Sequence, residues 1–371
     1  MKSIFVSLFI IFSVCGFSQK TTISGMITGF KDGTKIYLGD LEMGDIIQEG
    51  KIENNQFTFK NPSTFSPKKL YIDIKEDTTY YSMFFYVDNK SVKLFGDKTD
   101  FPNNIKVTGS KSYDENKLFE KSYQKLQFKK DSINELIDEK LKDTIKHSKN
   151  EIDNDRLIRK KLNEQIEDVQ LANVKIQPNT YIAVMFLSYF RDRLGKSEVS
   201  KLYNQLDDKL KQSVDGKGIK VYLELVKVLN EGDYYQDFTA KDVNNVLHKF
   251  SDYVGKKYIL LDFIQTSCYY CVISYDELKN INEKYKNDLQ IVTFSGDQAE
   301  STWKIGYKEY NIPWVSLWNG EGIMGKVPQT YGTDGTPTFI LINPEGKIIK
   351  KQYGYEEGLL DKILEETIAK K

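Results

Sequence analysis

The sequence is short of the residues that most metal and structural-disulfide chemistry requires. Its 371 residues include 2 histidines and 3 cysteines, and 53 basic residues balance 53 acidic ones. Because the formal net charge is zero, no basic excess favours nucleic acid or an anionic membrane surface as a partner. The length exceeds what one hydrophobic core usually serves, so two or three domains are expected.

Long apolar runs are also missing, and the first one in the chain is too short to cross a bilayer. It covers residues 3–14 and follows a charged start, which is the order of a secretory signal peptide. Small residues before Gln19 fit signal-peptidase cleavage there, so residues 1–18 are predicted to be a signal peptide. The mature chain is then expected in the periplasm or cell envelope without a transmembrane span. The alternative is a lipoprotein signal with Cys15 lipidated, although Val14 stands where such signals prefer a small residue.

Residues 19–110 consist of short runs of alternating hydrophobicity separated by turn-forming pairs. This pattern predicts an antiparallel β-sandwich. The segment contains no histidine or cysteine and its acidic residues are scattered, so we expect a structural or recognition module without a catalytic site. The runs on which the prediction rests are residues 22–27, 35–38, 56–59, 70–74 and 91–94.

Residues 111–231 change to Lys, Glu, Asp and Leu with apolar positions at helical spacing, which predicts amphipathic helices. Acidic residues interleave with the lysines of residues 128–149, so this stretch is interpreted as a solvated helix surface and not as a nucleic-acid face. The apolar run 181–190 is about half the length of a membrane span and is predicted to be a buried helix.

Residues 232–371 alternate between strand and helix patterns. Residues 257–264 form a nearly continuous apolar strand, as the centre of a parallel sheet requires. The expected order is β, α, β, α, β, β, α, so the sheet must mix parallel and antiparallel pairs.

Two cysteines, Cys268 and Cys271, lie three residues apart between this strand and a predicted helix. On a helix this spacing brings their Cβ atoms within about 5–6 Å, close enough for a reversible disulfide. Cys268 at the helix start faces unsatisfied N–H groups that stabilise a thiolate, so it is the expected nucleophile, and Cys271 the resolving thiol. A metal-binding pair would need further ligands, and His147 and His248 are not placed to supply them.

Together with these cysteines, several segments resemble the thioredoxin superfamily, in particular its exported TlpA-like and ResA-like branch of AhpC/TSA-type proteins. The resemblance covers about residues 233–371. The N-terminal part resembles, more weakly, a β-rich module of unknown function fused to such domains in Bacteroidetes-type proteins. The matching segments are Leu261-Asp262-Phe263, Tyr331-Gly332, Gly335-Thr336-Pro337-Thr338-Phe339 and Asn343-Pro344-Glu345-Gly346-Lys347-Ile348.

The resemblance implies an α/β thioredoxin-like fold for residues 232–371 and roles for single residues. Pro337 would be the cis-proline that holds Thr336 beside Cys268, where its backbone pairs with substrate; a trans proline is the alternative. Asp262 matches a buried carboxylate that assists proton transfer to the resolving thiol, and burial would raise its pKa. The alternative for Asp262 is an exposed position at the rim of the strand.

The sequence departs from this family at the surface that meets the substrate. Ser267 stands where relatives have Trp, and Tyr269 and Tyr270 separate the cysteines where many relatives have Gly-Pro or Pro-Pro. We expect Tyr269 and Tyr270 to contact substrate, with Tyr269 replacing the missing Trp. The exchange reaction itself is not put in doubt.

These observations predict an exported disulfide reductase of envelope proteins that needs no cofactor or metal beyond its redox-active pair, Cys268 and Cys271. Its expected partners are disulfide-containing exported proteins, with apocytochrome c as one option, and a membrane thiol reductase or oxidant that resets the pair. Two alternatives stay open. One is a non-enzymatic envelope protein with a permanently closed disulfide; the other is a thiol peroxidase, although Gln265 and Thr266 do not fit the peroxidatic motif.

Overall fold

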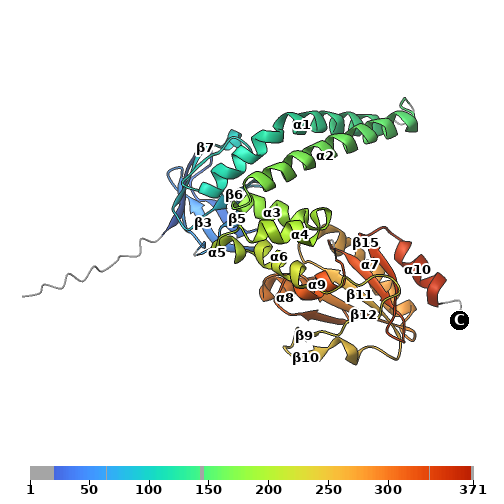
Figure 1. Cartoon of the computed structure of the whole chain (residues 1–371). Helices are drawn as coiled ribbons and strands as arrows, with labels where there is room; N and C mark the ends of the chain where they lie inside the picture. The colour runs from blue at the N-terminus through green and yellow to red at the C-terminus, as the bar shows by residue number, and fades with distance from the viewer. Residues whose placement is uncertain (1–20, 64, 143–145, 334, 369–371) are drawn as a thin grey trace, which may run out of the picture.

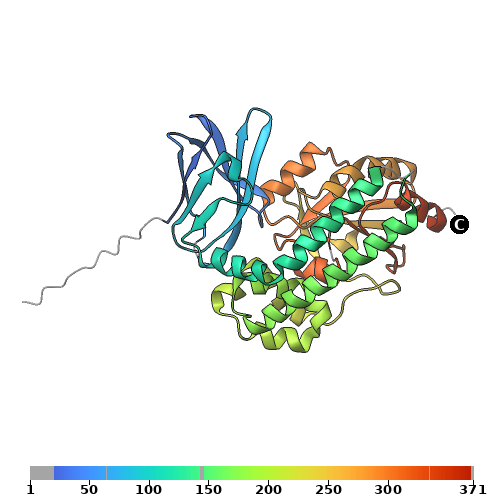
Figure 2. The same cartoon turned by 90° about the horizontal axis from the view of Figure 1, so that it is seen from above.

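The computed structural model describes residues 21–63, 65–142, 146–333 and 335–368. Figures 1 and 2 show β-strands at the N-terminal end, then helices, then a second sheet with helices around it. The predicted signal peptide at residues 1–18, its cleavage before Gln19 and the lipidation alternative at Cys15 all lie outside the described residues.

The strands that follow the described N-terminus form two four-stranded sheets that enclose one core. Alternating burial along β4 is typical of a sheet with one face on the core and one in solvent. One sheet has the order β4 (Gln56–Lys60), β1 (Thr22–Thr28), β7 (Val92–Asp97), β8 (Lys106–Thr108). The other has the order β3 (Asp45–Ile52), β2 (Thr34–Asp40), β5 (Lys68–Glu76), β6 (Thr79–Val87).

The pairing in the first sheet corrects the prediction that this sandwich is antiparallel throughout. Strands β1 and β7 run parallel, with Ile23 opposite Val92, whereas β1 and β4 are antiparallel. The physical reason is the route of the chain. Strands β5 and β6 of the other sheet intervene, so the chain returns to β1 by a crossover and arrives in the same direction.

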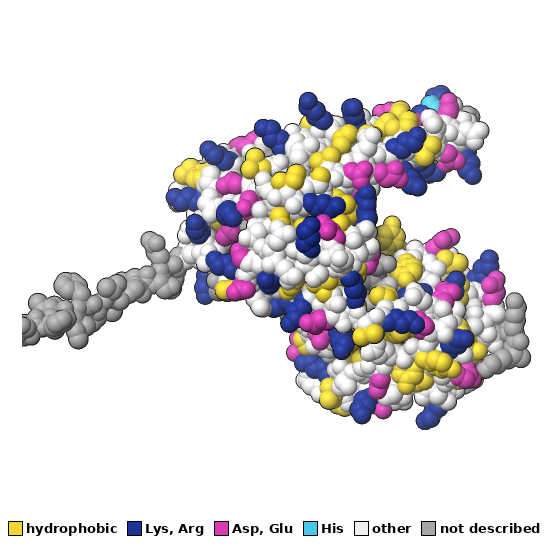
Figure 3. Space-filling model, in the orientation of Figure 1, with side chains coloured by type: hydrophobic (Ala, Val, Ile, Leu, Met, Phe, Trp, Pro, Cys, Tyr) yellow, Lys and Arg dark blue, Asp and Glu magenta, His cyan; other side chains and the backbone are white. Residues whose placement is uncertain are grey.

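The next part of the chain is helical. Helices α1 (Lys111–Lys142) and α2 (Lys149–Ile176) lie side by side as a long hairpin whose free end stands clear of the C-terminal domain (Figures 1 and 3). Figure 3 shows basic and acidic side chains mixed along this hairpin. Four shorter helices follow: α3 (Tyr181–Tyr189), α4 (Arg191–Tyr203), α5 (Asp208–Lys211) and α6 (Val214–Glu224).

Helix α3 is the apolar run that the sequence predicts to be buried, and most of its side chains are buried. It begins where the Thr180 hydroxyl accepts a hydrogen bond from the Ala183 N–H at 3.3 Å. Within the described residues, no helix combines the length and apolarity needed to cross a membrane.

The C-terminal domain is built on a seven-stranded mixed sheet. Its order is β10 (Leu247–Lys249), β9 (Thr239–Asp242), β13 (Val315–Trp318), β12 (Leu289–Ser295), β11 (Tyr258–Ile264), β14 (Thr338–Ile342), β15 (Ile348–Tyr353). Strand β11 is buried at every position and pairs parallel with β12 and antiparallel with β14. The expected mixed sheet is therefore present, but β13 and the hairpin of β9 and β10 were missing from the predicted order.

Helices cover both faces of this sheet. Helices α7 (Tyr269–Lys284) and α10 (Leu359–Ile368) pack on the face that carries Leu260, and α8 (Glu300–Glu309) adds aromatic side chains there. Helix α9 (Lys326–Thr330) packs on the face that carries Leu261. The end of β11 and the start of α7 thereby fix the place of the two cysteines.

Candidate active site

Cys268 is the residue at which helix α7 begins. The backbone N–H of Cys271 donates to Cys268 Sγ at 3.3 Å, so the sulfur itself caps the helix. The Cys268 thiol donates to the backbone carbonyl of Thr336 at 3.2 Å. Cys268 is partly exposed and Cys271 is completely buried. One sulfur can therefore meet a partner from solution, while the other is reached only through the first.

Thr336 comes from a segment 68 residues further along the chain. Its loop leads into β14, which pairs with β11, and this pairing carries the loop to the start of α7. The Thr336–Pro337 peptide bond is cis. The structure thus brings Thr336 and Pro337 next to the cysteine pair, although Thr336 lies 68 residues after Cys268 in the sequence.

The two thiols have opposite electrostatic surroundings. A hydrogen bond from the Cys271 side chain, with further bonds from the Thr336 side chain and from the N–H groups at the start of α7, lowers the pKa of Cys268 to about 6. Burial, followed by the hydrogen bond to Cys268, raises the pKa of Cys271 above its ordinary value. The exposed thiol is therefore ionised first and the buried thiol stays protonated.

Asp262 lies in the middle of β11 with no exposed surface, so the alternative of a position at the strand's rim is wrong. Period-two alternation places its side chain on the same face of β11 as Leu260, which is the face that α7 covers. Thr293 Oγ1 donates to Asp262 Oδ2 at 3.1 Å, and Asp262 Oδ1 has no hydrogen-bond partner. Burial raises the pKa of Asp262 to about 7, and its charge in turn raises the pKa of Cys271.

A second aspartate, Asp297, fixes the loop before Cys268, and sequence reasoning missed it. The N–H and hydroxyl of Thr266 donate to its two carboxylate oxygens at 3.0 and 2.7 Å, and Ser295 donates at 2.8 Å. The available signal was position, because Asp297 closely follows β12, and parallel strands β11 and β12 end at the same edge of the sheet. Asp297 thus fixes the position of Thr266 in this loop.

Exposed aromatic side chains stand on the elements next to the redox residues. Tyr269 is 70 % exposed and Tyr270 55 % exposed, and their rings form an edge-to-face pair at 5.5 Å. Tyr353 is also exposed and lies opposite Thr338 in the pairing of β14 with β15, next to the Pro337 loop. Two helix-borne rings and one strand-borne ring therefore face solvent close to the redox residues.

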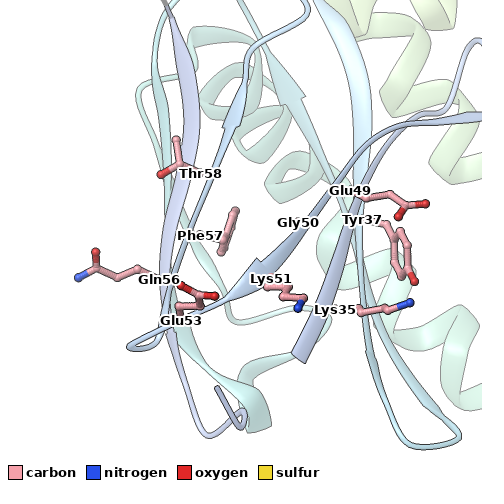
Figure 4. Close-up of a pocket in the computed structure, with 9 residues that line it drawn as sticks. All are labelled: Lys35, Tyr37, Glu49, Gly50, Lys51, Glu53, Gln56, Phe57 and Thr58. Atoms are coloured by element: carbon pink, nitrogen blue, oxygen red, sulfur yellow. The ribbon is translucent and has the colours of Figure 1, made fainter. Parts of the chain in front are cut away.

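Other parts of the described chain offer less chemistry. A cavity of about 620 Å³ opens on the N-terminal sandwich, where Figure 4 shows Lys35 on β2, Glu49 and Lys51 on β3, and Glu53 just after β3. It contains no thiol or imidazole. Among the described residues, no group of three or more His, Cys, Asp or Glu is placed to hold a metal ion.

Comparison with known proteins agrees with this geometry. Residues 255–348 match the family described as Thioredoxin-like, and residues 21–116 match a domain of unknown function, DUF4369. The thiol-disulfide oxidoreductase ResA of a Bacillus cereus strain is 28% identical over 134 residues, which cover 34% of this chain and 75% of ResA. Nucleoredoxin of Xenopus laevis is 31% identical over 91 residues, 24% of this chain and 20% of that protein.

Among solved structures, the thioredoxin domain of a thiol-disulfide oxidoreductase from Bacteroides vulgatus is 26% identical. The match covers 36% of this chain and 96% of that domain, with a TM-score of 0.34. The domain that contains residues 255–348 is thus thioredoxin-like, and over this domain the chain is similar to thiol-disulfide oxidoreductases such as ResA.

Proposed function

We propose that the protein is an exported thiol-disulfide oxidoreductase that reduces disulfides of envelope proteins with the dithiol of Cys268 and Cys271. The observation that carries this proposal is the contrast between the two sulfurs. Cys268 is partly exposed at the start of α7 with a pKa of about 6, and the thiol behind it is buried and protonated. An inert structural disulfide needs no such difference.

The first step is attack by the Cys268 thiolate on a substrate disulfide. A bond forms between Cys268 Sγ and one substrate sulfur, the substrate disulfide breaks, and the second substrate sulfur leaves as a thiolate. With a pKa of about 6, roughly nine tenths of Cys268 is ionised at neutral pH, far more than for an unperturbed thiol.

The second step is attack by Cys271 on the mixed disulfide. Cys271 loses its proton to Asp262, whose Oδ1 has no other partner and whose pKa of about 7 suits both uptake and release. The Cys271 sulfur then bonds to Cys268 Sγ and the substrate leaves with both sulfurs reduced. Two electrons pass from the dithiol to the substrate, and a membrane thiol reductase returns them to the pair.

Substrate contacts are proposed from the surface around the sulfur. Because the Thr336 carbonyl lies 3.2 Å from Cys268 Sγ, an extended segment in the mixed disulfide passes along the backbone of Thr336 and Pro337. The exposed rings of Tyr269 and Tyr270 supply apolar contact that does not depend on one sequence. This suits unfolded exported proteins with cysteines, apocytochrome c among them.

The test uses the chain from Gln19 onwards, the predicted mature form, with oxidised insulin as substrate and a chemical reductant. Cys268→Ala is expected to abolish turnover, because no other described cysteine is exposed. Cys271→Ala is expected to accumulate mixed disulfides, which non-reducing electrophoresis detects. The matched control is Ser267→Ala, next to the nucleophile, which should keep turnover within about twofold.

Two results would contradict the proposal. Unchanged turnover by Cys268→Ala would show that Cys268 is not the nucleophile. A reduction potential below about −300 mV would identify the pair as an inert structural disulfide. Export and direction are tested in cells: after fractionation, the pair should be found outside the cytoplasm and mostly as thiols. Peroxide consumption is expected to be absent because Gln265 and Thr266 do not fit the peroxidatic motif.

A further inference from the structure

Two buried hydrogen bonds in series lead to the carboxyl group of Asp262. Trp314 Nε1 donates to Thr293 Oγ1 at 2.9 Å, and Thr293 Oγ1 donates to Asp262 Oδ2 at 3.1 Å. Thr293 lies opposite Asp262 in the pairing of β12 with β11, and Trp314 directly precedes β13, the next strand of the sheet. We propose that Thr293 and Trp314 are positioning residues that hold Asp262 Oδ2, so that Oδ1 alone exchanges a proton with Cys271. This role rests on the proposed function, because it matters only when Cys271 attacks a mixed disulfide.

The direction of both bonds follows from the groups that make them. The indole N–H of Trp314 can only donate, so the Thr293 oxygen is its acceptor. A threonine hydroxyl has one proton, and within the described residues Asp262 is the only acceptor that Thr293 has for it. Thr293 has no exposed surface and Trp314 is 7 % exposed, so bulk water does not compete for these groups. The Thr293 hydroxyl proton therefore points at Asp262 Oδ2.

The other oxygen of the carboxyl group is left for the proton. Asp262 Oδ1 has no hydrogen-bond partner among the residues that the structure describes. A proton on Oδ2 would meet the proton of the Thr293 hydroxyl, which would then have to turn away from its acceptor at a cost in free energy. A proton on Oδ1 breaks no existing hydrogen bond. The neutral form of Asp262 thus carries its proton on Oδ1.

The titratable groups that face Asp262 come from helix α7. Burial raises the pKa of Asp262 to about 7, and the charge of Cys268 adds to this effect. Burial and the hydrogen bond to Cys268 raise the pKa of Cys271, and the charge of Asp262 raises it further. Burial and then the charge of Asp262 raise the pKa of Tyr275. The residues paired with Asp262 on β12 and β14 are not titratable. The carboxyl group is therefore close enough to the Cys271 thiol for their charges to interact.

The resolving step uses this arrangement. The thiol proton of Cys271 moves to Asp262 Oδ1, and the Cys271 sulfur forms a bond with Cys268 Sγ. The bond between Cys268 and the substrate sulfur breaks, and its electron pair leaves with the substrate thiolate. The hydrogen bond from Thr293 favours the charged form of Asp262 and so opposes the effect of burial on its pKa. Thr293 thereby keeps part of Asp262 ionised near neutral pH, as a proton acceptor must be.

The first measurement is an NMR titration of the Asp262 carboxyl carbon in the reduced chain from Gln19 onwards, labelled with ¹³C-aspartate. The signal is assigned by its loss in Asp262→Asn. Thr293→Val keeps the shape and removes the hydroxyl, so the midpoint of the titration should rise by about one pH unit. Trp314→Phe leaves the Thr293 hydroxyl free to turn and should raise the midpoint by a smaller amount. Thr293→Ser keeps a hydroxyl and should restore a midpoint within about 0.3 pH unit of the wild type.

The second measurement follows the mixed disulfide that the reduced chain forms with oxidised glutathione, by acid quenching and intact mass. If the midpoint of Asp262 moves from about 7 to about 8, its ionised fraction at pH 7 falls about fivefold. Thr293→Val should therefore resolve the mixed disulfide about fivefold more slowly at pH 7, and at nearly the wild-type rate at pH 9. A merely structural role would slow resolution equally at both pH values.

Ser316→Ala is the matched control on the neighbouring strand. Ser316 is buried, lies opposite Thr293 in the pairing of β12 with β13, and accepts from Trp303 Nε1 at 2.8 Å. This variant removes the same kind of bond between an indole and a hydroxyl, but no described hydrogen bond joins Ser316 to Asp262, so the Asp262 midpoint should not change.

The proposal is overturned if Asp262 titrates in Thr293→Val as in the wild type, or if Ser316→Ala moves the midpoint as far. Absence of any mixed disulfide in the wild type would instead contradict the proposed function, and with it the catalytic use of Thr293. The NMR titration separates these two failures, because it requires no turnover.

Discussion

The N-terminal sandwich buries Asp40 and the C-terminal domain buries Asp262, and the two carboxyl groups have opposite surroundings. Asp40, 2 % exposed in the sandwich, accepts from Lys68 Nζ at 2.6 Å and from the N–H groups of Glu42 and Met43. Asp262, with no exposed surface in the C-terminal sheet, has one hydrogen bond and no cation. An acid whose charge is fully compensated holds a fold together, whereas an uncompensated one keeps a proton that it can exchange.

The difference follows from where each aspartate lies in its strand. Asp40 is the last residue of β2, where the N–H groups of the following turn and the Lys68 ammonium group reach its carboxylate. Strand β11 is buried on both faces, so any polar residue in it must lose its hydration. A carboxyl group in such a strand lowers stability unless it is paired, and its presence there without a cation points to a role in the reaction.

Replacing Asp262 is expected to give the largest effect on the free energy of unfolding. Its pKa is about 7 folded and near 4 unfolded, so the folded state binds more protons between these values and the wild type loses stability as pH rises from 4 to 8. Asp262→Asn cannot ionise, so its stability relative to the wild type should rise by about 3.5 kcal/mol over this range. Urea unfolding at pH 4 and pH 8 measures the difference; an equal offset at both pH values would mean that Asp262 ionises normally.

Replacing Asp40 should change the free energy of unfolding in the opposite direction and by a slightly smaller amount. Asp40→Ala leaves the Lys68 ammonium group and two N–H groups without their acceptor, which should destabilise the chain by about 2–3 kcal/mol. Glu49→Ala, at an exposed position of β3, is the control and should change stability by less than about 0.5 kcal/mol. Urea midpoints at pH 7 provide the measurement, and a loss no greater than that of the control would show that the Asp40 carboxylate is not structural.

Local patterns predicted the parts of the fold and site that depend on neighbouring residues. The cysteine pair after an apolar strand placed Cys268 at the start of a helix, and the apolar neighbours of Asp262 indicated that it is buried. The parallel pairing of β1 with β7 was not predictable, because alternation fixes which face is buried and not the direction of the neighbouring strand.

Features that join distant segments were missed for a related reason. Asp297 and Thr266 are 31 residues apart, and the Gln329 amide contacts Gly218 across 111 residues. No periodicity or motif in the sequence indicates either contact, since both depend on how complete helices and strands pack against one another. The roles of Cys268, Cys271, Asp262, Thr336, Pro337, Tyr269 and Tyr270 stay predictions.

The pH dependence of Cys268 reactivity tests the difference between the two sulfurs. The rate of alkylation by iodoacetamide should rise with pH through a midpoint near 6, because only the thiolate reacts. Cys271→Ala removes the hydrogen bond that lowers the pKa of Cys268 most, so its midpoint should move to higher pH. Cys271→Ser keeps a hydroxyl donor and should restore a midpoint close to that of the wild type. A midpoint unaffected by Cys271→Ala would assign the low pKa to the helix start alone.

The smallest expected effect concerns the contact between the two regions. Asp45, at the start of β3 in the sandwich, accepts hydrogen bonds from Ser301, at 2.9 Å, and from Thr302 at the start of α8. The carbonyl of Thr302 lies 3.4 Å from the hydroxyl of Thr266, which belongs to the loop before Cys268. Thr302 therefore contacts both Asp45 and this loop. Asp45→Ala should cost about 1 kcal/mol of stability, as for a partly exposed hydrogen-bonded group.

Because Asp297 holds Thr266 by two bonds that Asp45→Ala leaves in place, insulin reduction by this variant should fall by less than about threefold. Hydrogen exchange should increase at the first turn of α8 and stay unchanged at the first turn of α7. A loss of activity of tenfold or more would contradict the view that the sandwich is a separate module. It would show that the sandwich helps to position the loop before Cys268. The matched variant Thr266→Val distinguishes the two cases, because it removes the Asp297 bond directly and should reduce activity more than Asp45→Ala does.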